Sequence, residues 1–265
     1  MFGRTFFTRC EPKCTPLFQR DISTASGGSK KSFGGSLEQT KSTHSASSTR
    51  SSSTTSQSSS LTVVELFQSQ GCSSCPPANQ NILGLMEDPD KLILTYEVTY
   101  WDHLGWKDTF GSSAHDARQR QYASAFNNRS VYTPQVIVNG RAEGVGSSSK
   151  DLRSILQRGT RGGAQSNVSV EVVDGVATIT GTGEGTALVS VVRYDPNVKD
   201  VRIARGENRG RTIPHRNVVR DITVLGVWTG QPMRFPLPGS DGQGLARAVV
   251  VQAGEGGPIL AAARV

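Results

Sequence analysis

Long apolar runs, histidine and cysteine are all scarce in this chain of 265 residues. A transmembrane helix needs about 18 or more consecutive apolar residues, and no segment reaches that length, so the sequence predicts no membrane span. The chain has four histidines and four cysteines. A structural zinc site takes about four such ligands close together, and here they are scattered along the sequence. We therefore expect neither a metal nor another cofactor.

A large basic excess is also lacking once the first 60 residues are set aside. The formal net charge of +7 comes from 29 basic and 22 acidic residues. Residues 1–60 hold 8 of the basic and 3 of the acidic ones, which leaves 21 and 19, a net +2, for residues 61–265. Nucleic-acid binding needs clustered positive charge to neutralise phosphates. The sequence therefore predicts no nucleic-acid partner.

Residues 1–60 contain few apolar side chains that could form a core. Residues 1–22 mix basic and apolar residues with only Glu11 and Asp21 as acids, a composition that resembles a mitochondrial transit peptide. Charged residues interrupt every candidate for a secretory signal. Residues 23–60 are rich in Ser, Thr and Gly and predict disorder. We therefore predict a disordered leader and a mitochondrial location, with a cytoplasmic protein as the alternative.

Two cysteines form a Cys-Ser-Ser-Cys sequence between an apolar run and a helical pattern. The run Leu61–Phe67 suits a buried strand, and Pro76–Met86 carries apolar residues at helical spacing. Cys72 is thus expected at a helix N-terminus, with Cys75 one turn inside. Unpaired backbone N–H groups and the helix dipole stabilise a thiolate there. The pattern predicts a redox dithiol.

Zinc binding and a structural disulfide are the alternatives for this pair. Zinc would need two more soft ligands, and His103, His115 and His215 are far apart in the sequence. A structural disulfide is less expected in a cytosolic setting. Redox chemistry remains the favoured interpretation.

The pattern of secondary structure changes along the chain. Strand and helix patterns alternate from Leu61, with a second strand over Lys91–Val98 and a helix over Ser112–Phe126, which is typical of an α/β sheet. After a Gly-rich linker, short Val-rich runs alternate with turns, which is typical of antiparallel strands. We predict an α/β domain over residues 61–160 with a helical insertion, and an all-β, sandwich-like domain over residues 164–265.

A Cys-x-x-Cys at a strand-to-helix junction, followed by Thr133-Pro134, a short apolar strand and Asn139-Gly140, resembles the thioredoxin superfamily. The resemblance implies a thioredoxin-like domain over residues 61–160. It also implies a cis proline whose loop lies against the dithiol, so that Thr133 and Pro134 flank Cys72 and take part in catalysis. One departure is Gly71, which stands where an aromatic residue normally precedes the first cysteine.

Three stretches resemble more narrowly the thioredoxin-like family known as domain of unknown function 1223. They are Val64–Ala78, Tyr100–Asp108 and Val131–Gln135. The resemblance runs from about Leu61 to the C-terminus and also takes in Gly206–Arg211 and His215–Arg220. It implies a fold and a dithiol rather than a particular substrate. Bacterial members of the family are often exported, whereas no signal peptide is recognisable here.

A cluster of aromatic and ionisable side chains follows the second predicted strand. Core packing is the ordinary role of tryptophan, with Asp102 or Asp108 as the partner of an indole N–H. The functional interpretation has Asp102 or His103 shuttling the proton of Cys75. The residues predicted to bind substrate are Trp101, Asp102, His103 and Trp106.

Two further features remain open at the level of the sequence. Residues Arg205–Arg220 hold a basic loop, which is either a solvated hairpin or an anion-binding patch that selects the partner of the dithiol. Glu65 and Glu97, on the two predicted strands, are candidates for a buried acid.

These patterns together predict a thiol–disulfide oxidoreductase. Cys72 is expected to attack and Cys75 to resolve the mixed disulfide. The expected partner is a protein or small-molecule disulfide or thiol. The alternative is a non-catalytic thioredoxin-like binding module, in which the dithiol is structural.

Overall fold

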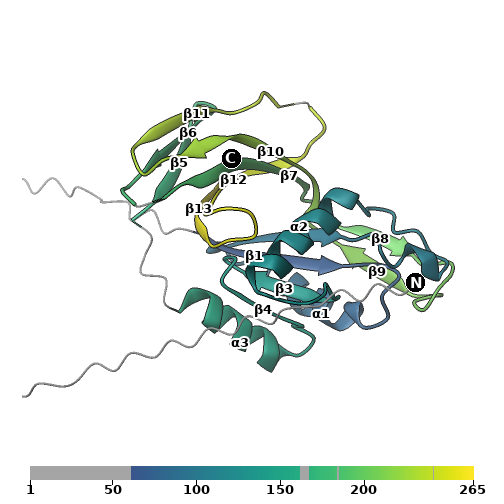
Figure 1. The fold of residues 1–265 in the computed structure, drawn as a ribbon. Helices are drawn as coiled ribbons and strands as arrows, with labels where there is room; N and C mark the ends of the chain where they lie inside the picture. Colours follow the sequence, from purple (N-terminus) through teal and green to yellow (C-terminus); the bar gives the residue numbers. More distant parts are fainter. Residues whose placement is uncertain (1–60, 162–166, 184, 241) are drawn as a thin grey trace, which may run out of the picture. The chain divides into compact units, whose positions relative to one another are not determined.

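A computed structural model of the chain describes residues 61–161, 167–183, 185–240 and 242–265 (Figure 1). These residues belong to one compact unit, Thr55–Val265. The predicted disorder and transit peptide of residues 1–60 lie outside the described residues. No helix in the described ranges is long and apolar enough to cross a membrane.

Helices and strands alternate in the first part of this unit. β1 and β2 are buried along almost their whole length, as expected for parallel strands covered on both faces. Ser112 and Ser148 cap α2 and α3 by accepting backbone N–H groups from Ala114 and Asp151, which satisfies donors that the first helical turn leaves free. The elements are β1 (Thr62–Gln68), α1 (Cys75–Leu83), β2 (Lys91–Glu97), the 3-10 helix η1 (Asp102–Leu104), α2 (Ser113–Ala125), β3 (Gln135–Val138), β4 (Ala142–Gly144) and α3 (Ser149–Thr160).

The second part consists of strands. Asp174 and Gly175 both have positive φ values, 48° and 71°, which suits the tight turn of the β5–β6 hairpin. The elements are β5 (Ser169–Val173), β6 (Val176–Thr180), β7 (Ala187–Asp195), β8 (Lys199–Arg202), β9 (Thr212–His215), β10 (Val218–Trp228), β11 (Met233–Pro236), β12 (Ala246–Gln252) and β13 (Ile259–Arg264).

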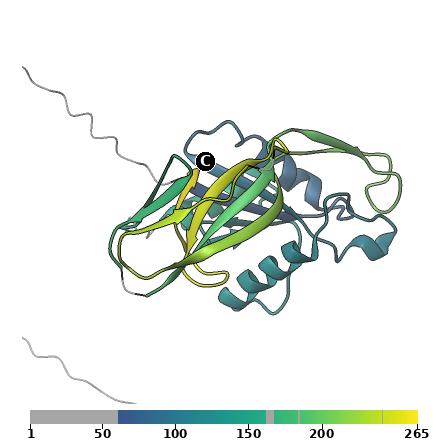
Figure 2. The same ribbon diagram turned by 90° about the horizontal axis from the view of Figure 1, so that it is seen from above.

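One mixed sheet of eight strands runs through both parts, in the order β13-β12-β7-β10-β2-β1-β3-β4. Figures 1 and 2 show the early strands, in blue, continuing into the later green and yellow ones. β10 joins β2 where Val218 pairs with Thr95. Asn217 strengthens this junction, because its carbonyl accepts the Thr95 N–H at 3.0 Å and its side chain donates to the Ile93 carbonyl at 2.9 Å.

The predicted fold class is therefore wrong. An α/β thioredoxin-like domain followed by a separate all-β, sandwich-like domain was expected, whereas the regular structure of the described residues is mostly strand and contains three α-helices. The physical reason is the junction of β2 with β10. β2 is a central strand with neighbours on both sides, so strands of the second part extend the sheet of the first instead of forming a separate sandwich.

Side chains of β1 alternate between two apolar layers, because successive residues of a strand point to opposite faces. Val64 and Leu66 pack with Ile82 of α1 and Ile155 of α3. Residues of the other face pack with α2 and continue without interruption into the second part of the chain. That layer includes Val63, Phe67, Leu94, Tyr96, Tyr122, Val192, Tyr194, Val219 and Val250.

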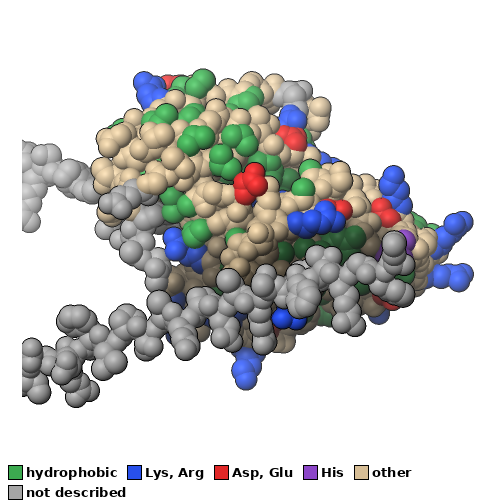
Figure 3. All heavy atoms as spheres, in the orientation of Figure 1, with side chains coloured by type: hydrophobic (Ala, Val, Ile, Leu, Met, Phe, Trp, Pro, Cys, Tyr) green, Lys and Arg blue, Asp and Glu red, His purple; other side chains and the backbone are tan. Residues whose placement is uncertain are grey.

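Two smaller sheets complete the fold. β11, β6 and β5 form a three-stranded sheet over a layer that contains Trp228, and β8 and β9 form a two-stranded hairpin. Basic side chains project at the right of Figure 3, where Figure 1 places this hairpin.

A buried ion pair holds α2 against the sheet. Arg118 of α2 donates its Nε to Glu65 of β1 at 2.8 Å, and the two side chains are 13% and 1% exposed. Tyr122 also donates to Glu65, and Gln252 of β12 accepts from Arg118 at 3.3 Å. The network therefore ties α2 to strands from both parts of the chain. It also confirms Glu65 as a buried acid.

Loss of this pair should cost far more stability than loss of an exposed one. Arg118→Met leaves the Glu65 carboxylate buried without its cation, and we expect it to lower the free energy of unfolding by about 3–5 kcal/mol. Arg193→Met is the control, because its pair with Asp221 is about one-third exposed and is expected to contribute only about 0–1 kcal/mol. Urea unfolding measures both. Equal losses in the two variants would contradict the account.

Candidate active site

The Cys-Ser-Ser-Cys segment lies at the end of β1, where the chain turns before α1. The Cys72 N–H donates to the Ser69 carbonyl at 3.1 Å, and the Gly71 N–H donates to Ser69 Oγ at 3.1 Å. Cys75, predicted one turn inside the helix, is instead its first residue, with Ser74 as N-cap. Cys72 therefore precedes the helix by three residues, at its N-terminal end.

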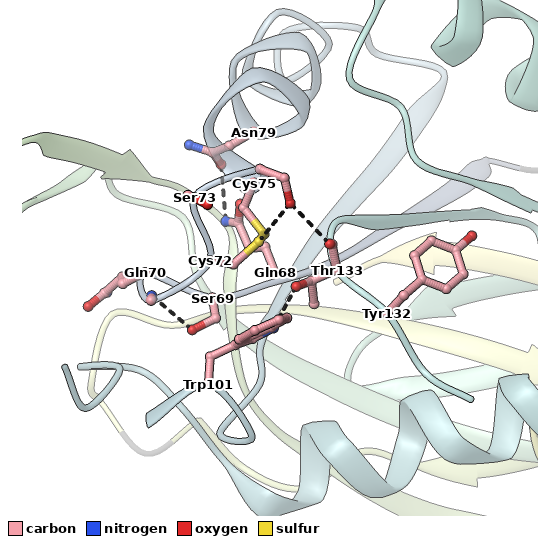
Figure 4. Close-up of a disulfide and its surroundings, with 12 residues drawn as sticks. Gln68, Ser69, Gln70, Cys72, Ser73, Cys75, Asn79, Trp101, Tyr132 and Thr133 are labelled. Carbon is pink, nitrogen blue, oxygen red and sulfur yellow. Dashed lines mark hydrogen bonds between the residues drawn. A yellow bond between two sulfur atoms is a disulfide. The ribbon is translucent and has the colours of Figure 1, made fainter. Parts of the chain in front are cut away.

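Cys72 and Cys75 are joined by a disulfide, with their Cα atoms 5.5 Å apart (Figure 4). Both cysteines are only 2% exposed, whereas Ser73 and Ser74 between them are exposed. The Ser74 hydroxyl lies 3.3 Å from Cys72 Sγ and 3.4 Å from the Thr133 carbonyl. A hydroxyl carries one hydrogen, so it can donate to only one of these two acceptors at a time.

Thr133 and Pro134 are brought to the dithiol, and the peptide bond between them is cis, as the resemblance implied. Trp101 completes this side of the site by donating its indole N–H to Thr133 Oγ1 at 2.7 Å. Trp101 passes Gly71 so closely that a Cβ on that glycine would lie 3.3 Å from the Trp101 Cβ and 3.4 Å from its carbonyl oxygen. Trp101 thus takes the space next to the residue that precedes the first cysteine.

The remaining residues predicted to bind substrate divide into two groups. Trp106 reaches the dithiol segment, because its indole N–H donates to Gln70 Oε1 at 2.9 Å. Asp102 and His103 bond within their own segment: Asp102 Oδ1 accepts the Asp108 N–H at 3.0 Å, and the exposed His103 lies 2.9 Å from the Tyr100 carbonyl. The suggestion that Asp102 or Asp108 accepts an indole N–H is wrong.

Asp108 binds the backbone of the turn that precedes Cys72. Its two carboxylate oxygens accept the backbone N–H groups of Gln70 at 2.7 Å and Phe110 at 2.9 Å, and the residue is 3% exposed. Burial, reinforced by the negative charge of Glu97, raises the pKa of Asp108 to about 8. A neutral carboxylic acid is therefore present beside the dithiol segment at neutral pH.

Glu97 is the second predicted buried acid, and the structure confirms its burial. Its Oε1 lies 3.0 Å from His215 Nδ1 of β9 and accepts from Gln68 Nε2 at 2.9 Å. Burial acts to raise the pKa of Glu97, but the charge and hydrogen bond of His215 outweigh it and lower that pKa. Burial likewise acts to lower the pKa of His215, and Glu97 reverses the direction. The two form a buried ion pair.

This pair is linked to α1 through amide side chains. Gln68 also contacts Asn79 Oδ1 at 3.1 Å, and Asn79 donates to the Pro214 carbonyl at 2.7 Å. Asn79 lies one helical turn after Cys75. β9 is therefore held against the helix that carries the second cysteine.

Asn208 is the residue of the site that the sequence did not single out. It lies in the loop between β8 and β9, is fully buried, and donates its amide to the carbonyls of Gln70 at 2.9 Å and Cys72 at 2.8 Å. Its neighbour Glu207 accepts the Ser73 N–H at 3.2 Å. The only sequence signal was its place in Gly206–Arg211, a stretch that shared the family resemblance without any assigned role.

No three His, Cys, Asp or Glu side chains come together as a set of metal ligands in the described ranges. The free ring nitrogen of His215, Nε2, is buried and has no hydrogen-bond partner among the described residues. Its other nitrogen is occupied by Glu97, so the imidazole serves the ion pair.

Comparison with known proteins gives a family and one informative structure. A family model described as "Protein of unknown function (DUF1223)" matches residues 63–252. A crystal structure of a protein from Agrobacterium tumefaciens is 32% identical, covers 78% of this chain and 94% of its own, and superposes with a TM-score of 0.65. HBP35 of Porphyromonas gingivalis is 14% identical over 78% of this chain and 75% of its own, with a TM-score of 0.48. No curated protein matches the chain.

The raised pKa of Asp108 predicts a specific dependence of stability on pH. An aspartate in the unfolded chain has a pKa of about 3.9, whereas the pKa of Asp108 in the folded protein is about 8. Between these two pH values Asp108 is protonated in the folded protein and ionised in the unfolded chain. This contribution is complete below the unfolded pKa. It declines as pH rises from the unfolded towards the folded pKa, with a slope of up to about 1.4 kcal/mol per pH unit, and is fully lost once pH has passed the folded pKa.

Asp108→Asn, which cannot titrate, should remove that slope. We expect the difference in unfolding free energy, wild type minus variant, to fall as pH rises from about 5 to about 8. Urea unfolding at several pH values measures it. Parallel curves for the two proteins would show that Asp108 is ionised in the folded state.

Proposed function

The chain belongs to the DUF1223 family of proteins of unknown function, and from this premise we propose that it is a thiol–disulfide oxidoreductase. The observation that carries the proposal is the Cys72–Cys75 disulfide at the start of α1, with Ser74 and Thr133 beside it. Two cysteines so placed can alternate between a disulfide and a dithiol without a change of fold.

Cys72 is the attacking residue in this proposal. It lies at the N-terminal end of α1, where helix N–H groups carry partial positive charge, and the first turn of that helix contains no acidic residue. In the reduced protein the Ser74 hydroxyl can turn from the Thr133 carbonyl to the Cys72 thiolate, which is the stronger acceptor because it is charged. Both effects lower the pKa of a thiol.

Cys75 then resolves the intermediate. The Cys72 thiolate attacks one sulfur of a substrate disulfide, which forms a mixed disulfide and releases the first substrate thiolate. The Cys75 thiolate attacks Cys72 Sγ and releases the second substrate thiolate. Two electrons pass from the protein to the substrate, and the Cys72–Cys75 disulfide is restored. The reverse sequence oxidises a substrate dithiol.

The surroundings of the pair position it for these steps. Asn208 binds the carbonyls of Gln70 and Cys72, and Asp108 accepts the Gln70 N–H. The nucleophile is therefore presented from a fixed turn. The Thr133 carbonyl, with Pro134 next in the chain, lies 3.4 Å from the Ser74 hydroxyl that borders Cys72 Sγ. Their part in binding an extended substrate beside Cys72 is a proposal, and so is substrate contact by Trp101 and Trp106.

Alkylation of single-cysteine variants tests the function. In the reduced Cys75→Ser variant we expect Cys72 to react with iodoacetamide with an apparent pKa below the free-thiol value of about 8.5. Cys72→Ser is the matched control, because it leaves Cys75, which is already part of the helix, whereas the Ser74 hydroxyl lies 3.3 Å from Cys72 Sγ. The Cys75 thiol should therefore react more slowly. The rate of alkylation as a function of pH measures both.

A Cys72 pKa at or above about 8.5 would contradict the proposal. The disulfide would then be a structural cross-link, and the chain a non-catalytic binding module. The Ser74→Ala substitution in the Cys75→Ser background gives a second measurement of the Cys72 pKa. It should raise the pKa of Cys72, since it removes the hydroxyl 3.3 Å from the sulfur.

A further inference from the structure

The loop between β8 and β9, residues 203–211, is a fixed part of the rim around the dithiol. Asn208 and Glu207 bind the Cys72 segment directly. Gly206 lies against the η1 segment, where a Cβ would come within 3.5 Å of the Trp106 Cβ. The ends of the loop are closed by Ile203 and Arg211, whose N–H and carbonyl pair at 2.9 Å. The loop is thus anchored on the two segments that border Cys72.

The outward side chains of this hairpin concentrate positive charge. Residues 199–211 contain five basic and two acidic residues, a net +3, whereas residues 61–265 as a whole carry +2 (21 basic minus 19 acidic). The rest of residues 61–265 therefore carries a net charge of −1, from 16 basic and 17 acidic residues. The excess positive charge of the folded part lies in the hairpin that reaches the dithiol. Figure 3 shows basic side chains projecting at this end.

Four guanidinium groups of the hairpin are available to a partner. They belong to residues that are exposed, and within the described ranges none of them has an ion-pair or side-chain hydrogen-bond partner. The nearest acid in the loop, Glu207, is engaged by Ser73, whose hydrogen bonds lower the pKa of that carboxylate. The four residues are Arg202, Arg205, Arg209 and Arg211.

Resting on the proposed function, we infer that these arginines recognise the substrate of the dithiol and that this substrate carries carboxylates close to its disulfide. Arginine presents a planar fork of donors that matches a carboxylate. Asn208 anchors the loop on the carbonyls of Gln70 and Cys72, and the backbone of Arg209 is held next to the Cys72 segment because Arg209 follows Asn208 directly in the chain. The carboxylates belong either to a small disulfide or to acidic residues that flank a cysteine in a polypeptide.

Exchange with small disulfides of different charge tests the inference. The reduced full chain reacts with dithiodiglycolate, bis(2-hydroxyethyl) disulfide or cystamine, which are anionic, neutral and cationic. Cys72 attacks the probe and releases one probe thiolate, and Cys75 displaces the second, so the protein is oxidised and the probe is reduced. The rate with each charged probe is divided by the rate with the neutral probe. At low ionic strength we expect the resulting value for the anionic probe to exceed that for the cationic probe by about tenfold or more.

Salt and charge removal should abolish that preference. At about 1 M salt the Debye length is about 3 Å. The ratio of the anionic-probe rate to the cationic-probe rate should then approach the ratio measured for a free thiol. The Arg205→Gln/Arg209→Gln double variant should lower the ratio several-fold at low salt. Arg153→Gln/Arg234→Gln is the matched control, since it removes two exposed charges from α3 and β11, and it should leave the ratio unchanged.

The possible failures are distinguishable. If the reduced protein exchanges with no probe, the proposed function falls and this inference falls with it. If it exchanges with all three probes at rates that neither salt nor the arginine variant changes, the oxidoreductase stands and the inference is overturned. Equal effects of the two double variants also overturn it. Glutathione disulfide, compared with a disulfide-linked acidic peptide, then identifies the source of the carboxylates.

Discussion

The buried ion pair of Glu97 and His215 is the interaction on which the site depends. Two charges removed from water are tolerated only when each has a close partner, and these partners come from β2 and β9, 118 residues apart. Satisfying the pair therefore requires β9 to lie beside β2. Asn79 and Gln68 extend the constraint to α1.

The position of the dithiol follows from that constraint. Once β9 is held against β2 and α1, the loop between β8 and β9 reaches the Cys72 segment, where Asn208 binds two carbonyls. The site is therefore made by both parts of the chain. Its inner side holds a neutral Asp108 and an ion pair, and its outer side carries exposed arginines. Almost no surface of the disulfide itself is exposed.

Local elements of this structure could be predicted from the sequence, whereas their assembly could not. The apolar run Leu61–Phe67 and the helical pattern Ser112–Phe126 correspond to β1 and α2 within one or two residues, because periodicity reports which side of an element is buried. It does not report which strand lies alongside. The junction at Thr95 and Val218 was therefore missed, and the fold class with it.

In the candidate site, too, local features could be predicted from the sequence and contacts between distant segments could not. The two cysteines and the Thr133-Pro134 loop could be found because the Cys-x-x-Cys spacing and the Thr-Pro dipeptide are recognisable in the sequence. Trp101 and Trp106 lie near the dithiol, but their indole N–H groups bond to Thr133 and Gln70 and not to an aspartate, since hydrogen bonds between distant segments leave no trace in spacing. Asn208 was missed because a single amide in a basic loop has no pattern of its own.

The central claim is that Cys72 and Cys75 form a reversible redox couple, and its reduction potential tests this most directly. The fraction of disulfide is measured in the full chain across buffers of known potential. We predict a midpoint between about −120 and −300 mV, the range of dithiols that exchange with cellular partners. A pair that stays oxidised well below about −300 mV, as structural disulfides do, would contradict the account.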